Sequence, residues 1–154
     1  MQNTLREEED MAMQFLQHLL RVVLSVVTIL LAGYSGWVSS NEVKVALSGD
    51  QEIPPVTTSA IGTGTITVAA DKSVSGNVTI SGMSPTVAHI HEAAAGKNGP
   101  IVVPLSKTSD TVWSIPEGAK FTDAQYESYK AGNLYFNVHS AERKGGEIRG
   151  QIKP

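Results

Sequence analysis

Three histidines are the residues of this sequence best suited to chemistry. His89 and His91 are two positions apart, and His139 lies in a later β-prone run. Side chains alternate across a strand, so His89 and His91 project from the same face and can converge on one ion. Imidazole binds copper, zinc, iron and nickel, and a His-x-His pair with a distant histidine commonly builds a three-nitrogen site. The spacing predicts a metal site at His89, His91 and His139; the alternative is three surface histidines without a ligand.

The last two β-prone runs place a cation beside this site. In residues 134–139 every second side chain is apolar, which leaves Tyr135, Asn137 and His139 on the polar face. In residues 147–152 the same division puts Arg149 on the outward face. Residues 140–146 are short enough to join the two runs as a hairpin, which predicts Arg149 on the same outer surface as His139. The alternative is that Arg149 pairs with Glu147 or Glu142 on an exposed sheet face.

Short β-prone runs separated by Gly, Pro, Asn and Ser clusters must position these side chains. The candidate strands are residues 43–47, 60–69, 75–80, 86–91, 101–105, 134–139 and 147–152. This spacing predicts an all-β domain, either an immunoglobulin-like or Greek-key sandwich or a barrel.

One short helix is also expected. Thr122 and Gln125 form a capping-box pattern, and Gly132 can supply the left-handed stop. Tyr126 and Tyr129 would share a face of this helix and pack on the sheet.

Composition excludes several function classes. The chain has no cysteine, which rules out disulfides, iron–sulfur clusters, thiolate zinc sites and cysteine nucleophiles. A formal net charge of -3 gives no electrostatic reason to expect nucleic acid as a partner. Asp50, Glu52 and Glu92 are interpreted as solvated loop carboxylates, because no spacing pairs two of them.

The first forty residues are interpreted as an export segment. Residues 15–38 are mostly apolar, and residues 22–32 carry no charge. Arg21 precedes this region and small residues around Ser40 suit a cleavage site, which is typical of a signal peptide. The alternative is an uncleaved membrane anchor, because the run approaches the ~17–25 residues that span a bilayer. Residues 1–40 are thus a signal peptide or anchor, residues 41–154 the domain, and the protein is expected to be exported to the periplasm or the extracellular space.

Several segments of the domain resemble the CHRD (chordin-type) domain family. They are Leu47-Ser48-Gly49 through Glu52-Ile53-Pro54-Pro55-Val56, Ala88-His89-Ile90-His91, Asn98-Gly99-Pro100-Ile101-Val102, and the run from Leu134 to Ser140 with Gly145 to Gly150. The resemblance covers essentially all of residues 43–152. It implies an immunoglobulin-like β-sandwich in an exported protein and does not supply an activity.

A weaker resemblance concerns the copper strand of copper/zinc superoxide dismutases. Ala88-His89-Ile90-His91-Glu92 looks like their His-x-His-Glu segment, and Val138-His139 with Gly145 to Gly150 looks like their final copper histidine and active-site arginine. The resemblance implies copper at the three histidines and an anion-guiding Arg149. This chain has no histidine to bridge copper and zinc and no cysteine, so no zinc subsite is expected. A single copper ion would keep an open position for water, Glu92 or an anion.

Three functions remain open on the sequence. The first is an exported protein that binds one copper ion per chain and serves in metal storage, metal delivery or electron exchange. The second is a dismutase-like copper enzyme in which Arg149 is catalytic. The third is a metal-free binding or adhesion module that meets another exported protein.

Overall fold

The computed structural model describes residues 13, 17 and 42–154. The chain divides into two units, residues 1–39 and 40–154, and the described residues belong almost entirely to the second. The predicted signal peptide or anchor falls outside the described residues apart from two positions. Among the described residues, no helix combines the length and the apolar character needed to cross a membrane.

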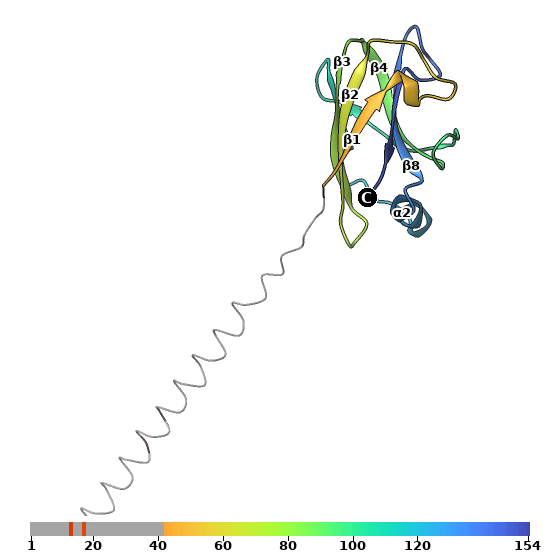
Figure 1. Ribbon diagram of the computed structural model, residues 1–154. Coiled ribbons are helices and arrows are strands. Elements are labelled where there is room, and N and C mark those ends of the chain that lie inside the picture. Colours follow the sequence, from red (N-terminus) through yellow and green to blue (C-terminus); the bar gives the residue numbers. More distant parts are fainter. Residues whose placement is uncertain (1–12, 14–16, 18–41) are drawn as a thin grey trace, which may run out of the picture. The chain divides into compact units, whose positions relative to one another are not determined.

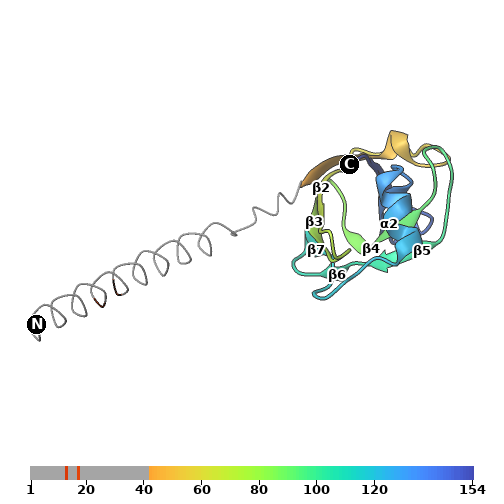
Figure 2. The ribbon, with the colours of Figure 1, turned by 90° about the horizontal axis from the view of Figure 1, so that it is seen from below.

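The domain is built on one antiparallel sheet whose strand order is β5-β4-β8-β9-β1-β2-β3-β7-β6. The strands are β1 (Val43–Ser48), β2 (Ile61–Val68), β3 (Val74–Ser81), β4 (Pro85–Glu92), β5 (Ile101–Pro104), β6 (Ser106–Lys107), β7 (Val112–Ser114), β8 (Leu134–Ser140) and β9 (Ile148–Ile152). The sheet is strongly curved (Figures 1 and 2). Its two edge strands, β5 and β6, follow each other directly in the chain, so the curvature brings the two edges close together. The fold is therefore mostly β with a nearly closed, barrel-like sheet, as the all-β prediction required.

Alternating apolar side chains fill the interior of this sheet. β3 contributes Val78 and Ile80, β4 contributes Ala88 and Ile90, and β8 contributes Phe136, all at most 1% exposed. Each fully buried Val, Ile or Phe side chain stabilises the fold by roughly 1.5–3 kcal/mol. A Cβ on Gly64 would lie 2.9 Å from the Phe136 ring, so glycine makes room for the aromatic side chain.

The predicted helix is α2 (Asp123–Lys130), which lies at one end of the sheet (Figure 2). Thr122 and Gln125 form both bonds of the capping box, as predicted. At the other end Gly132 has a φ of 71°, and the amides of Gly132 and Asn133 bond to the carbonyls of Tyr129 and Ser128. This is a Schellman stop. Tyr129 is buried in the core and Tyr126 packs against it.

All seven predicted strands are present, with ends that match or differ by one residue. The sequence prediction missed two short strands, β6 and β7, and the 3-10 turn η1 (Gly49–Gln51). β7 is only three residues long but pairs Trp113 with Val78 of β3, which anchors it to the core. Tertiary packing therefore overrides a local composition that reads as loop.

Candidate metal centre

Strands β4 and β8 bring the three histidines together. They pair antiparallel, with Val87 opposite His139, His89 opposite Asn137 and His91 opposite Tyr135. Because side chains alternate, both histidines of β4 share one face with His139, while Ala88 and Ile90 point into the core. The predicted common face for His89, His91 and His139 is present in the structure.

The ring nitrogens of these histidines converge. One nitrogen from each ring lies within 4.8 Å of one from each of the others, and no other group of three or more such residues is found in the described part of the chain. Nδ1 of His89 is 3.3 Å from Nε2 of His139. The ring centroids are 5.2–6.3 Å apart. The group could hold a metal ion.

Backbone carbonyls fix the proton positions on two of the rings. Nδ1 of His91 is 2.9 Å from the carbonyl oxygen of Gly99, and Nδ1 of His139 is 2.9 Å from that of Lys144. A carbonyl can only accept, so both Nδ1 atoms carry the proton and both Nε2 atoms are unprotonated. Nε2 of His139 accepts the hydrogen bond from Nδ1 of His89, and Nε2 of His91 accepts none. Metal-binding histidines almost always donate their other ring nitrogen in this way.

The Nε2 lone pair of His91 has no partner. It is one of two buried side-chain nitrogen or oxygen atoms without a hydrogen bond among the described residues, the other being Nε1 of Trp113. Leaving a buried polar atom unsatisfied costs about 1–3 kcal/mol. A metal ion bound between the three rings would satisfy this atom.

The environment keeps all three imidazoles neutral. Burial, then the neighbouring His139 and His91, lowers the pKa of His89 to about 4. Burial is also the main cause of the lowered pKa values of His91 and His139. Neutral imidazole is the form that binds metal, so at neutral pH the group needs no deprotonation.

The lowered pKa predicts an acid-sensitive metal-free protein. Between pH 6.5 and about 4 the unfolded chain binds a proton that folded His89 does not. The free energy of unfolding should therefore fall as the pH drops through this window. Denaturant titrations in the presence of a chelator should show a shallower pH dependence for His89→Ala than for the unsubstituted protein. Identical slopes would contradict the prediction.

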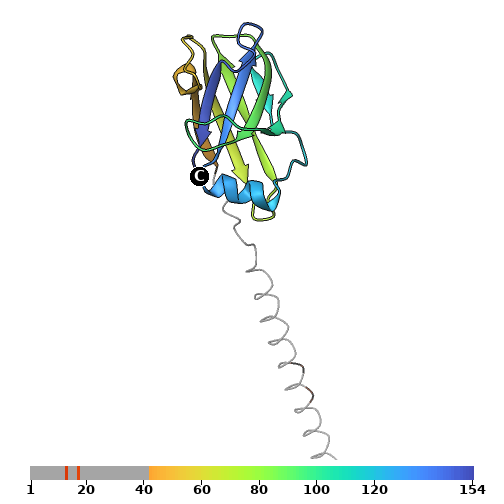
Figure 3. The same cartoon turned by 90° about the vertical axis from the view of Figure 1, so that its right-hand side faces the viewer.

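The face that carries the histidines is covered, where the sequence predicted an exposed polar face. His139 is 8% exposed and Arg149 only 2%. The segment between β4 and β5 crosses β8 and β9, and the amide of Gln151 donates to the carbonyl of Ala93 there (Figure 3). Alternation shows which side chains share a face, but a loop from elsewhere in the chain decides whether that face meets solvent.

Arg149 is on the predicted face but in a different environment. Its guanidinium lies 3.5 Å from the centre of the Tyr135 ring. It donates to Oδ1 of Asn98, the carbonyl oxygen of Lys97 and Oε1 of Gln151. The expected alternative pairing with Glu147 or Glu142 does not occur among the described residues. A buried guanidinium with three acceptors is not placed to receive an anion from solvent.

Two carboxylates also depart from the sequence interpretation. Glu92 accepts a hydrogen bond from the hydroxyl of Ser128 and is not part of the metal group. Glu52, interpreted as a solvated loop residue, is 5% exposed and accepts a hydrogen bond from Asn137. Burial raises the pKa of Glu52, while the Asn137 bond and the charge of Arg149 oppose that rise.

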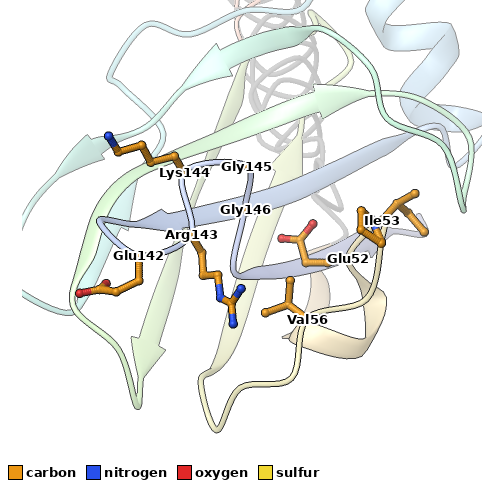
Figure 4. A pocket seen from close by; sticks show the side chains of 9 residues that line it. Glu52, Ile53, Val56, Glu142, Arg143, Lys144, Gly145 and Gly146 are labelled. Carbon is orange, nitrogen blue, oxygen red and sulfur yellow. The ribbon is translucent and has the colours of Figure 1, made fainter.

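A pocket adjoins this buried pair. Its cavity has a volume of about 290 Å³, with Glu52, Ile53, Pro54 and Val56 on one side and residues 142–146 on the other (Figure 4). The carbonyl of Lys144, in the second wall, is the acceptor for Nδ1 of His139. The pocket wall and the metal group therefore share a segment of chain.

Comparison with known proteins identifies a domain family. The family model described as CHRD domain matches residues 43–152. No curated protein and no solved structure matches the chain. The resemblance to the copper strand of the superoxide dismutases therefore gains no support from these comparisons.

Proposed function

The chain belongs to the CHRD domain family, and we propose that it is an exported protein that binds one copper ion through His89, His91 and His139. The family suggests a binding module, and the histidine group gives that module a specific ligand. Metal storage, delivery or electron exchange are the roles that such a site can serve.

The carrying observation is the arrangement of lone pairs. Two of the three rings are fixed by backbone carbonyls with Nε2 unprotonated, and Nε2 of His91 is buried without a partner. Three imidazole nitrogens lie within 4.8 Å of one another, so a small inward movement of the rings would bring them to the spacing of ligands on one ion. Histidines without a ligand would leave Nε2 of His91 buried and unsatisfied.

The donor set favours copper. All three donors are imidazole nitrogens, and a given nitrogen site binds Cu²⁺ more tightly than Zn²⁺ or the earlier divalent metals of the series. The chain has four histidines and no cysteine, so a second site of dismutase type has no donors. Arg149, the residue expected to guide an anion, is buried and hydrogen-bonded, so the geometry favours binding over dismutation.

Export is proposed from the apolar stretch at residues 15–38. Cleavage near Ser40 would release the domain, and retention of the stretch would tether it to a membrane. Mass spectrometry of the protein recovered from its host would distinguish the two, because cleavage removes about forty residues.

A competition titration tests the metal assignment. The protein is purified without a tag, its metal content is measured, and copper and zinc are titrated against a chelator of known affinity. We expect about one copper per chain and weaker binding of zinc. A protein that retains no copper against the chelator, or binds it with no preference over zinc, would contradict the assignment.

Folding is expected not to depend on the metal. The interior is filled by apolar side chains from most of the strands, unlike a zinc finger, which is unfolded without its ion. Chelation should lower the melting temperature by mass action and leave a cooperative transition. Circular dichroism of the chelated protein checks this, and a disordered far-ultraviolet spectrum would contradict it.

A further inference from the structure

Residues 97–99 connect Arg149 to the metal group. The guanidinium of Arg149 donates to the carbonyl of Lys97, at 2.8 Å, and to Oδ1 of Asn98, at 3.1 Å. The carbonyl oxygen of the next residue, Gly99, accepts a hydrogen bond from Nδ1 of His91. The segment that accepts the hydrogen bond of His91 Nδ1 is therefore held by Arg149, whose own hydrogen bonds in the described structure go to Lys97, Asn98 and Gln151.

Tyr135 holds the same segment from the other direction. Its hydroxyl oxygen accepts a hydrogen bond from the amide of Gly99. Its ring stacks on the His91 ring at 5.0 Å with an interplanar angle of 12°, and the Arg149 guanidinium lies 3.5 Å from its centre. Tyr135 thus contacts both ends of the Gly99–His91 hydrogen bond.

Residues 97–99 are packed tightly between strand β4 and a second loop. A Cβ on Gly99 would lie 1.9 Å from the carbonyl oxygen of Glu92, so only glycine passes this close to β4. The side-chain amide of Asn98 donates to the carbonyl of Ile53, which ties the segment to a second loop. Its position is therefore set by contacts on both sides.

We propose that Arg149 and Tyr135 are positioning residues of the metal centre: they hold residues 97–99 so that the Gly99 carbonyl keeps the proton of His91 on Nδ1 and leaves Nε2 free for the ion. The role rests on the proposed metal-binding function. In this proposal Arg149 positions residues 97–99 and does not guide an anion to the metal. Outer partners of metal ligands change affinity by about 10–100-fold when they are removed.

Two conservative variants test the proposal. Tyr135→Phe keeps the stacked ring and removes only the hydroxyl that accepts from Gly99. Arg149→Lys keeps a positive charge and loses the planar fork that reaches Lys97 and Asn98 together. Tyr129→Phe is the matched control for the hydroxyl, because Tyr129 is buried on α2 and its hydroxyl makes no hydrogen bond within the described residues.

The first readout requires no metal. Long-range ¹H–¹⁵N spectra of the metal-free protein report which nitrogen of His91 carries the proton. We expect Nδ1 in the unsubstituted protein and in Tyr129→Phe, and a mixture of tautomers in Tyr135→Phe and Arg149→Lys. A role in stability alone would leave the tautomer unchanged, so an unchanged His91 tautomer in both variants would overturn the proposal.

The second readout is copper affinity by competition titration. We expect a loss of about tenfold or more in each variant and no change in Tyr129→Phe. Full affinity in both folded variants would overturn the positioning role while leaving the copper site in place. A tautomer shift in a protein that binds no copper would support the positioning of His91 and refute the proposed function instead.

Discussion

Alanine at His89, His91 or His139 is expected to weaken copper binding by about 100-fold or more. Each substitution removes one of three nitrogen donors, and loss of a ligand should exceed the ~10–100-fold effect of losing an outer partner. Alanine at all three positions should abolish specific binding. Competition titration of each variant against a copper chelator measures the loss.

The remaining histidine of the chain, His18, provides a control when the titrated protein retains residues 1–40. His18→Ala should bind copper as tightly as the unsubstituted protein. If the triple variant keeps the original affinity, or if His18→Ala loses as much as His139→Ala, the site is elsewhere.

Asn137→Ala is expected to cost about 2–4 kcal/mol of unfolding free energy at neutral pH. The side-chain amide of Asn137 donates to the buried carboxylate of Glu52 and to the carbonyl of Ile148. Removing it leaves the buried Glu52 carboxyl group without that hydrogen bond, and such losses are large because the desolvation of the remaining group is no longer offset. Chemical denaturation measures the change, with Asn77→Ala on β3 as the control.

The pH dependence of this variant identifies its cause. Burial raises the pKa of Glu52 and the Asn137 bond opposes the rise, so the variant should raise that pKa further. A raised folded pKa means that protonation favours folding, so the deficit in unfolding free energy should shrink as the pH falls below neutral. Adding Glu52→Gln should recover part of the stability at neutral pH. If the loss of unfolding free energy in Asn137→Ala does not change with pH and is not relieved by Glu52→Gln, its cause is lost packing instead.

Local patterns predicted the elements well. The capping box at Thr122 and the stop at Gly132 depend on neighbouring residues, and the alternation that places His89 and His91 on one face depends only on strand geometry. Such features involve short sequence separations, so the sequence contains what is needed to infer them. Strand β6, with two residues, has too little pattern to detect.

The environment of the site could not be predicted in the same way. Arg149, Asn137 and Glu52 read as surface residues because they alternate with apolar ones or lie in a loop. They are buried because residues 93–99 and the turn after β1 fold over the sheet. These contacts join positions about fifty to ninety residues apart, and alternation gives no information on what lies above a polar face.

Copper(I), which is diamagnetic, permits the most direct test of the three-histidine centre. Long-range ¹H–¹⁵N spectra of the imidazoles are recorded while the protein is titrated under anaerobic conditions. We expect one ring nitrogen of His89 and Nε2 of His91 and His139 to shift together and to saturate at one equivalent, with His18 unchanged when residues 1–40 are retained. Nδ1 of His91 and His139 should stay protonated, because these atoms donate hydrogen bonds to the carbonyl oxygens of Gly99 and Lys144. Spectra in which fewer than three of these nitrogens respond, or in which His18 responds instead, would contradict the assignment.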